Sequence, residues 1–380
     1  MRTFLTFLSA AIAALLTAGD PADSAEPYDI TGLGTLPGFA DSLGYSINDS
    51  GQVTGYAEVA EEGGIITSHA FLYSDGVMTD LGTLPRYAAS AGYGINATAQ
   101  VVGNAAPAMG ALHAFLSSNG VMTDLGTLPG FAESLAHGVN ADGQVVGYCD
   151  GGPADGTHAF LYGGGVMTDV GTFPGGNITE GFAINASGQV TGWGNTTPNG
   201  DSCAFLYSHG ALTNLGVPPG YVNSAGAAIN ASGEIAGNAS TSLGESSHAF
   251  SYDNGVWTDL GVLSGCQFGY GLGINANGQV VGYSQTASGN DLAFIYSNGV
   301  MTDLNSLISP SSGWELEEAT GINDLGQITG YGEFGGRYEA FLLNAVVPEP
   351  SAVVLAGLGF AGLLVLGRRN RWRRSAVGSG

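Results

Sequence analysis

The chain has 380 residues, of which 65 are glycine and only 11% are charged, whereas charged residues make up about a quarter of an average soluble domain. Hydrophobic residues reach 44%, so the chain can bury a sizeable core, and a largely disordered chain is excluded. Acidic residues number 32 against 8 basic ones, and the formal net charge of −24 excludes a nucleic acid partner held through its phosphates.

The first 24 residues have the pattern of a secretory signal peptide. Arg2 gives a positive start, residues 4–17 are apolar, and small residues follow as far as Ser24. We expect the secretion machinery to recognise residues 1–24 and to export the rest of the chain. The alternative is that this apolar segment forms a buried core helix.

Three short phrases each recur seven times within residues 26–346, with a period of about 45 residues. The first is Leu-Gly-Thr-Leu-Pro or a degraded copy of it, the second is Ile-Asn or Val-Asn, and the third is Ala-Phe. This periodicity predicts a repeat architecture. We number the repeats 1 to 7 by the asparagine of the second phrase, which is in turn Asn48, Asn96, Asn140, Asn185, Asn230, Asn275 and Asn323.

Each repeat offers four short strands separated by turn residues. The first strand ends in Gly-Ile-Asn, as at 94–96, and the third is His-Ala-Phe-Leu-Tyr, as at 158–162. An Asn-Gly pair such as 119–120 predicts a tight hairpin between the third and fourth strands. Four antiparallel strands in about 45 residues are typical of a β-propeller blade. We therefore expect an all-β fold over residues 26–346, a seven-bladed β-propeller of four-stranded blades; an open β-solenoid is the alternative.

The last repeat lacks a fourth strand, and a spare copy of that strand stands at the beginning of the body. Repeat 7 runs from its third strand, at 339–343, straight into the C-terminal tail. Residues 28–33 parallel the fourth strand of repeat 2, at 121–125. We expect this N-terminal strand to complete the last blade and to remove the open edge of the sheet.

The third phrase is preceded by histidine at His69, His113, His158 and His248. In this triplet the body resembles the HAF family of extracellular repeats, which implies an exported repeat protein. The other three repeats depart from the triplet, with Cys203, Leu292 and Glu339 in place of histidine. Because the four histidines occupy equivalent places in separate blades, they cannot converge on one metal ion. We expect each of them to stabilise its own blade through a hydrogen bond.

We expect ligand binding on the face that carries the loops between the second and third strands and the loops between blades. These loops vary in length and sequence, and variable loops on a rigid scaffold commonly bind ligands. Aromatic rings beside polar groups suit stacking and hydrogen bonding to carbohydrate, which makes a polysaccharide the expected partner. The alternative for the aromatic residues is wedge packing between blades. The candidate residues are Phe39, Asp41, Tyr87, Phe131, Glu133, Tyr221 and Trp314.

Catalytic motifs are scarce in the body. It contains only Arg86 and Arg337 as basic residues, and neither a G-x-S-x-G nor an H-E-x-x-H motif. We therefore expect a non-enzymatic binding or structural module without a cofactor. The alternative is a glycan hydrolase or lyase that uses the acidic cluster of Glu315, Glu317 and Glu318 beside Trp314.

Metal and disulfide sites are not strongly indicated. The Asn-x-x-Gly turns resemble calcium loops only weakly, since a calcium loop needs several more oxygen ligands, and we favour turn chemistry without a metal. Cys149, Cys203 and Cys266 contain no C-x-x-C pair, which argues against a zinc cage. Two alternatives stay open for them: one Cys149–Cys203 disulfide, or three unpaired thiols.

The chain ends in a Pro-Glu-Pro triplet, an uncharged segment and an arginine cluster. Residues 352–367 form a run of 16 uncharged residues, about 24 Å long as a helix, which is slightly short for a bilayer. Flanking arginines can extend the effective span, and they favour the cytoplasmic side. We therefore expect 352–367 to be a single transmembrane helix that holds the body outside the inner membrane.

In this order of features, residues 347–374 resemble the PEP-CTERM sorting signal of bacteria. The resemblance implies that an exosortase recognises and removes the tail and passes the protein to the cell surface or the exopolysaccharide matrix. The alternative is a plain C-terminal membrane anchor. The residues that match the signal are Pro348, Glu349, Pro350, Arg368, Arg369 and Arg371.

Overall fold

A computed structural model describes residues 27–346, apart from gaps at 61–65, 109, 152–155, 199 and 242–244. The described residues contain 28 β-strands, and residues Tyr28–Asn344 form one compact unit. The expected signal peptide and the whole expected tail, with the transmembrane helix at 352–367, lie outside the described residues. Within the described residues, every helix is too short or too polar to cross a membrane.

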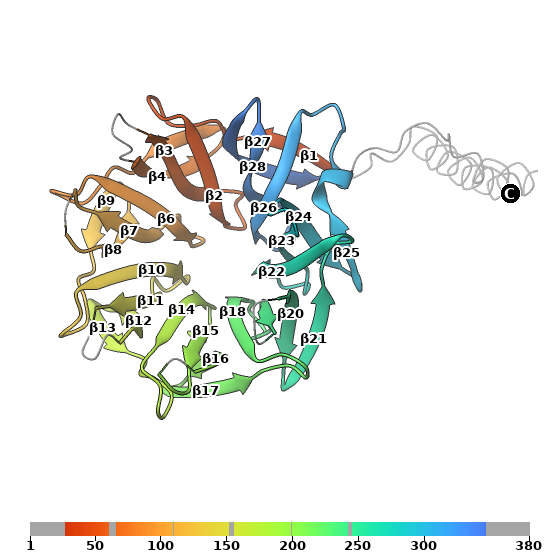
Figure 1. Ribbon diagram of the computed structural model, residues 1–380. Helices are drawn as coiled ribbons and strands as arrows, with labels where there is room; N and C mark the ends of the chain where they lie inside the picture. The colour runs from red at the N-terminus through yellow and green to blue at the C-terminus, as the bar shows by residue number, and fades with distance from the viewer. Residues whose placement is uncertain are drawn as a thin grey trace, which may run out of the picture. The chain divides into compact units, whose positions relative to one another are not determined.

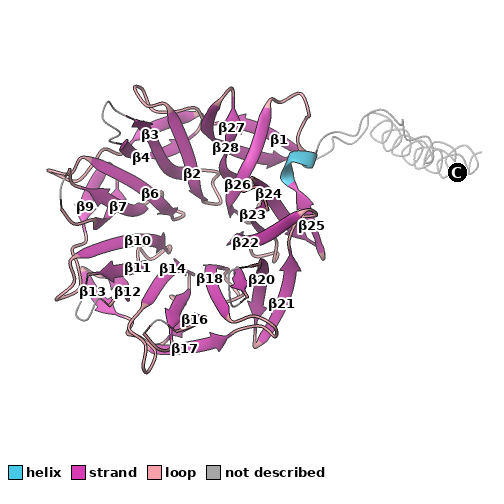
Figure 2. Cartoon of the chain, viewed as in Figure 1, coloured by secondary structure: helices cyan, strands magenta, loops and turns pink. Residues whose placement is uncertain are grey.

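The elements are short and alternate with tight turns. A single 3-10 turn, η2 (Leu304–Leu307), stands out among the strands of the described chain (Figure 2). In chain order the strands are β1 (Tyr28–Gly32), β2 (Asp41–Ile47), β3 (Val53–Ala60), β4 (Ile66–Ser74), β5 (Val77–Asp80), β6 (Ala89–Ile95), β7 (Val101–Ala106), β8 (His113–Ser118), β9 (Val121–Asp124), β10 (Glu133–Val139), β11 (Val145–Asp150), β12 (His158–Gly163), β13 (Val166–Asp169), β14 (Thr179–Ile184), β15 (Val190–Asn195), β16 (Ser202–Ser208), β17 (Ala211–Gly216), β18 (Asn223–Ile229), β19 (Ile235–Ser240), β20 (Ser247–Asp253), β21 (Val256–Gly261), β22 (Cys266–Ile274), β23 (Val280–Thr286), β24 (Asp291–Ser297), β25 (Val300–Asp303), β26 (Trp314–Ile322), β27 (Ile328–Phe334) and β28 (Arg337–Ala345).

The strands of each repeat form an antiparallel sheet, and the sheets surround a common axis with the first strand of each innermost (Figure 1). Repeats 1 to 4 form the four-stranded sheets β2–β5, β6–β9, β10–β13 and β14–β17. The strands of repeats 5 and 6 are joined in one eight-stranded sheet, because the long strand β22 makes a single parallel pair, Ser247 with Phe268, to β20. The all-β, β-propeller-like fold that the sequence predicts is therefore confirmed.

The last sheet combines the two ends of the body. Its strand order is β1-β28-β27-β26, so the N-terminal strand lies beside the third strand of repeat 7, as the sequence predicts. The pairing continues into the next loop, where the N–H of Leu33 donates to the carbonyl of Ala340 at 2.9 Å. The last sheet also contacts the first one, since the N–H of Ala340 on β28 donates to the hydroxyl oxygen of Ser42 on β2 at 3.0 Å.

The asparagines of the second phrase form a closed belt around the axis, which we call the asparagine belt. The side-chain amide of each one donates to the backbone carbonyl of the asparagine in the next repeat, at 2.9–3.2 Å. Asn323 closes the belt by donating to the carbonyl of Asn48 at 3.0 Å. Each amide oxygen accepts the N–H groups two and four residues later, as Asn48 does from Ser50 and Gln52. The Asn-x-x-Gly turns are thus held by backbone hydrogen bonds.

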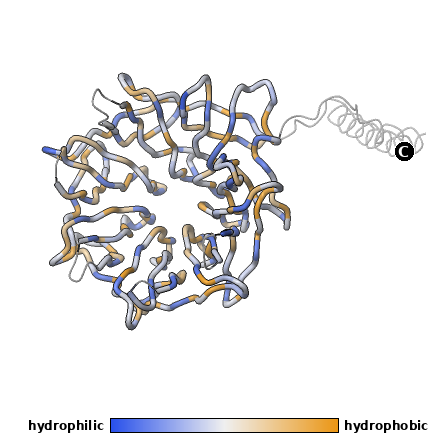
Figure 3. Tube along the Cα trace, viewed as in Figure 1, coloured by the Kyte–Doolittle hydropathy of each residue, from blue (hydrophilic) through white to orange (hydrophobic). Residues whose placement is uncertain are grey.

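The core lies between neighbouring sheets. The phenylalanine of each Ala-Phe phrase is almost completely buried, with Phe250 the most exposed at 3%. Burial of one such side chain contributes roughly 2–3 kcal/mol. Hydrophobic and hydrophilic residues are interspersed all around the ring rather than gathered in one region (Figure 3). Every repeat therefore supplies its own share of the core.

Candidate ligand-binding site

The four loop aromatics predicted for the ligand face each pack against a histidine of a His-Ala-Phe triplet. The rings are tilted by 46–55°, and the contacts are made within separate repeats, so the four aromatics do not converge on one site. The centroid distances are 5.1 Å for Phe39–His69, 5.8 Å for Tyr87–His113, 5.0 Å for Phe131–His158 and 5.7 Å for Tyr221–His248.

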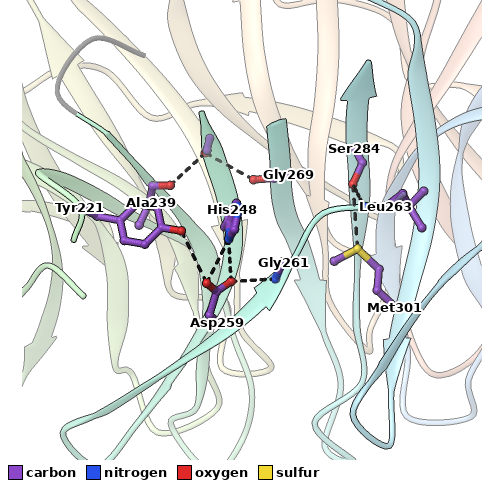
Figure 4. Close-up of polar contacts among 10 residues, drawn as sticks. Tyr221, Ala239, His248, Asp259, Gly261, Leu263, Gly269, Ser284 and Met301 are labelled. Carbon is purple, nitrogen blue, oxygen red and sulfur yellow. Dashed lines mark hydrogen bonds and ion pairs between the residues drawn. The ribbon is translucent and has the colours of Figure 1, made fainter. Parts of the chain in front are cut away.

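Each of these histidines is held by an aspartate at the end of the fourth strand. The imidazole Nδ1 lies 2.8–2.9 Å from the carboxylate in all four repeats. In repeat 5, shown in Figure 4, the carboxylate of Asp259 contacts His248, accepts the N–H of Gly261 at 2.8 Å, and lies 3.5 Å from the hydroxyl of Tyr221. The hydrogen bond expected of the triplet histidines is therefore present.

The loop aromatic and the histidine occur together in repeats 1, 2, 3 and 5, whereas repeat 7 has Trp314 at the loop position and Glu339 at the histidine position. Repeats 4 and 6 have Cys203 and Leu292 in place of histidine, and the corresponding loop positions are Gly176 and Cys266 instead of an aromatic residue. In the first six repeats the aromatic residue and the histidine are therefore kept or lost together, as ring-on-ring packing favours. Phe39, Tyr87 and Phe131 also pack against core clusters that contain residues of two neighbouring repeats. This supports the wedge-packing alternative for these three aromatics, and their role in ligand binding stays a prediction.

The other three candidate residues also lie apart. Asp41 accepts the N–H of Tyr338 at 3.1 Å, and Glu133 stands opposite Asp150 at the edge of its sheet. Trp314 stacks on Phe334 with the centroids 4.9 Å apart and packs against the core of repeat 7. The structure therefore distributes the predicted ligand-face residues over the ring.

The described residues line an open cavity of about 430 Å³ at the axis, within the usual size range of small-molecule sites. One position in every first strand, three residues before the belt asparagine, contributes to its lining, and we call these residues the axial ring. Four of them carry an aromatic or imidazole ring and three do not. The axial ring consists of Tyr45, Tyr93, His137, Phe182, Ala227, Leu272 and Thr320. Ala225, Asn238, Tyr283 and Glu318 complete the lining of the cavity.

The four cyclic side chains of the axial ring form a continuous wall. Tyr45 meets Tyr93 edge-on at 5.1 Å, Tyr93 stacks on His137 at 5.3 Å, and His137 meets Phe182 edge-on at 5.2 Å. These contacts fix the rings relative to one another before a ligand arrives. On the facing side, the axial-ring residues of repeats 5 to 7 are smaller or aliphatic, and Tyr283 and Glu318 line the cavity beside them.

His137 lies in this wall as a neutral imidazole. Burial lowers its pKa to about 4, so the ring is uncharged at pH 7. Its Nε2 atom is buried and has no hydrogen-bond partner among the described residues. A buried polar atom without a partner costs about 1–3 kcal/mol, which a ligand group that bonds to it can offset.

Glu318 supplies the acidic group of the cavity. It precedes the axial-ring residue Thr320 and faces Tyr331 across the sheet, and burial raises its pKa to about 7 despite a hydrogen bond to Tyr331. Asp291 and Glu317 raise the pKa further by repulsion. Near neutral pH this carboxyl group can therefore donate or accept a proton. Of the acidic cluster singled out in the sequence, Glu318 is the member that lines the cavity.

Sequence reasoning missed the axial ring. Within the repeated phrase Gly-x-x-Ile-Asn, the first variable position differs in character from repeat to repeat while its neighbours hardly change. That contrast is the signal that could have identified the position. We predicted the loop aromatics as the ligand-binding residues instead, because they are large and lie beside carboxylates.

The cysteines and other potential metal ligands do not gather into a site. Cys149, Cys203 and Cys266 are free thiols on β11, β16 and β22, so the Cys149–Cys203 disulfide is not formed. Burial raises the pKa of Cys149 to about 11, which keeps it a thiol. In the part of the chain that the structure describes, no three His, Cys, Asp or Glu side chains are grouped to hold a metal ion.

Comparison with protein families identifies the tail. Residues 346–371 match the PEP-CTERM protein-sorting motif. The chain therefore carries a signal for exosortase, which marks an exported, membrane-processed protein of the cell envelope or the extracellular space. The resemblance to the HAF repeat family finds no support, and no curated protein matches the sequence.

Several solved structures share the fold at low identity. A puromycin hydrolase, as an S511A mutant complexed with PGG, is 15% identical with a TM-score of 0.51, over 84% of this chain and 55% of its own. A puromycin-hydrolyzing peptidase of Mycobacterium tuberculosis is 12% identical with a TM-score of 0.49, over 80% and 56%. The β-propeller domain of the Trilobed protease from Pyrococcus furiosus is 8% identical with a TM-score of 0.40, over 71% and 97%. The chain spans little more than half the length of the first two proteins, and the likeness shows the fold alone.

These neighbours correct one expectation. The sequence led us to expect that the protein is not an enzyme, and that expectation is contradicted by propeller-fold neighbours that include a puromycin hydrolase. Two missing motifs and few arginines exclude only particular catalytic mechanisms. The same fold carries many different chemistries on different residues, so the missing motifs do not exclude an enzyme.

Proposed function

We propose that the protein is an exported, seven-bladed β-propeller whose axial cavity binds an uncharged saccharide at the cell surface or in the exopolysaccharide matrix. In this proposal residues 1–24 are the signal peptide, 26–346 the propeller, and 347–374 the sorting signal with its transmembrane helix at 352–367. The asparagine belt, with one member from each of seven repeats, supports the blade count, and the sorting motif supports the destination.

The asymmetry of the axial ring is the observation that carries the proposal. A wall of fixed rings from Tyr45 to Phe182 offers flat faces for the C–H surface of a sugar. Asn238, Glu318 and Thr320 across the cavity offer hydrogen-bonding groups to hydroxyls. The body carries 29 acidic residues and two arginines between 26 and 347, so an anionic polymer is repelled and an uncharged one is favoured.

Alanine substitutions distinguish the axial cavity from the loop aromatics. Tyr45→Ala and Phe182→Ala each remove part of the wall and are expected to weaken binding of a neutral oligosaccharide about tenfold, or about 1.4 kcal/mol, by calorimetry. Tyr221→Ala is the matched control and should leave affinity unchanged. Loss of binding in Tyr221→Ala with full binding in the other two would move the site to the loop aromatics.

A glycan hydrolase or lyase is the second candidate, because Glu318 lines the cavity with a pKa near 7, as a general acid requires. If the protein cleaves bound glycan, reducing ends accumulate with the wild type, and Glu318→Gln abolishes them while binding persists. Binding by the wild type without any product contradicts this second candidate and leaves the saccharide site intact.

The sorting part of the proposal has its own test. Replacing Pro348 and Pro350 together by alanine should prevent recognition of the tail and leave full-length protein in the inner membrane. The measurement is an immunoblot of separated membrane and extracellular fractions. Unchanged processing of the double variant argues that these prolines are not part of the signal.

A further inference from the structure

The size of one pair of residues on the first and second strands differs from repeat to repeat beside the proposed saccharide site. Two residues before each axial-ring residue, a residue of the first strand pairs with a residue of the second strand. In five repeats the pair contains tyrosine or tryptophan, and in repeats 2 and 5 it is alanine with asparagine. The bulky pairs are Leu43–Tyr56, Leu135–Tyr148, Glu180–Trp193, Tyr270–Tyr283 and Glu318–Tyr331, and the small pairs are Ala91–Asn104 and Ala225–Asn238.

Each of the two small pairs lines a cavity. A side cavity of about 190 Å³, which we call the Asn104 recess, is lined by Ala91 and Asn104. The axial cavity is lined by Ala225 and Asn238. Tyr93 lines both cavities, so the recess and the axial cavity lie on either side of one side chain. A tyrosine in place of Asn104 would fill space that the other repeats fill.

The two cavities contain polar atoms that make no hydrogen bond within the described residues. Among the described residues, two buried side-chain polar atoms lack a hydrogen-bond partner, and they are Asn104 Oδ1 and His137 Nε2. One belongs to a residue of the recess and the other to a residue of the axial cavity. Since native proteins pair nearly all buried polar groups, two exceptions in adjoining cavities point to a ligand that supplies the missing partners.

The recess and Asn238 lie in repeats 2 and 5, three repeats apart around the ring of seven belt asparagines. A path from the recess past Tyr93 to Asn238 therefore crosses the axis. The carboxyl groups on this path belong to Glu58 in the recess and Glu318 in the axial cavity, and the path contains no lysine or arginine. An anionic sugar such as a uronate would meet only carboxyl groups there.

We propose that the Asn104 recess and the axial cavity form one elongated site for an uncharged oligosaccharide of at least two sugar units, with the amides of Asn104 and Asn238 bonding to its two ends. This inference rests on the proposed saccharide site and extends it from a single unit to a chain that lies across the axis. The ring wall from Tyr45 to Phe182 supports the middle of that chain.

The test compares ligands of different length in the wild type and in Asn104→Tyr. The probes are cello-, malto- and N-acetylglucosamine oligomers of one to six units, measured by calorimetry on the full-length protein. The wild type is expected to bind the oligomers of its preferred series at least tenfold more tightly than the single unit. Asn104→Tyr should lower oligomer affinity to the single-unit value and change single-unit affinity less than twofold.

A second substitution in the same repeat controls for the added ring. Ser117→Tyr introduces the tyrosine that repeats 1 and 3 to 6 carry on the third strand, at the end of the sheet near the asparagine belt. It should leave binding of every oligomer unchanged. Asn104→Leu keeps the side-chain volume but removes the amide, and it should weaken oligomer binding at least fivefold. This variant keeps the elongated site testable if Asn104→Tyr folds poorly.

The binding results distinguish the elongated site from the saccharide site on which it rests. Equal wild-type affinity for one unit and for longer oligomers overturns the elongated site and leaves the axial cavity as a single-unit site. Full oligomer binding by folded Asn104→Tyr or Asn104→Leu overturns it as well. Absence of binding for all three series, single units included, overturns the proposed saccharide site itself.

Discussion

The two ends of the first strands differ in how far the repeats resemble one another. At the belt end, every repeat has asparagine, and each side chain makes the same bond to the next repeat. Three residues earlier, the axial ring runs from tyrosine to alanine and differs in nearly every repeat. Uniform residues hold neighbouring sheets together, whereas varied residues give a nearly symmetric ring one distinct cavity.

The largest effect is expected at the closing bond of the belt. Asn323→Ala removes the donor to the carbonyl of Asn48 and the acceptor for the N–H groups of Leu325 and Gln327. The loss of these three hydrogen bonds should lower the free energy of unfolding by about 3 kcal/mol, measured by urea denaturation. Leu272→Ala at the axial end is the control, with an expected loss of about 1 kcal/mol. Equal losses would contradict the division of roles between the two ends.

A substitution of Glu318 is expected to raise the free energy of unfolding, by a smaller amount than Asn323→Ala lowers it. Its carboxyl is protonated in both the folded and the unfolded chain below pH 4.5, and the folded chain keeps the proton until about pH 7. The wild type therefore loses stability as the pH rises from 4.5 to 7. Glu318→Gln removes this loss and should raise the free energy of unfolding by about 1–2 kcal/mol at pH 8, with no gain at pH 4.

Thermal unfolding at the two pH values checks this sign. Asp291 and Glu317 also act on Glu318 through their charge, and Tyr331 bonds to it. Asp291→Asn is the matched control, because it removes one of the two repulsive charges and should give a smaller gain at pH 8. A gain for Glu318→Gln at pH 4 as large as at pH 8 would show that charge is not the cause.

The smallest effect is expected where the ends of the body meet. In the repeats with histidine, the carboxylate belongs to the fourth strand, as in Asp80, which accepts the N–H of Gly82. In the last sheet Gly32 takes that position, and Glu339, in the histidine position, accepts the N–H of Gly34 at 2.9 Å. A side chain on Gly32 would clash with Glu339.

Because Gly32 and Glu339 have exchanged the positions of the carboxylate and its partner, a double substitution should recover the stability that each single substitution loses. Glu339→His and Gly32→Asp should each cost about 1 kcal/mol alone, the first by losing a hydrogen bond and the second by the clash. Together they restore the arrangement of repeats 1 to 3, and the double variant should regain most of the stability in urea unfolding. Additive losses in the double variant would show that the two positions do not interact.

The fold could largely be predicted from the sequence, because a strand pattern repeated every 45 residues or so determines local structure and the spare strand at Tyr28 indicates how the last sheet is completed. The asparagine belt could not, since its bonds join residues of neighbouring repeats whose relative placement the sequence does not show. The candidate site was predicted only in part. Glu318 belonged to the predicted acidic cluster, whereas the axial ring was missed because its residues become neighbours only around the axis.

A crystal structure of the protein soaked with the tightest-binding neutral oligosaccharide tests the central claim most directly. The account predicts electron density for sugar rings against Tyr45, Tyr93 and Phe182, with a hydrogen bond to Asn104 at one end. Density only against the loop aromatics, with an unoccupied axial cavity, would contradict it.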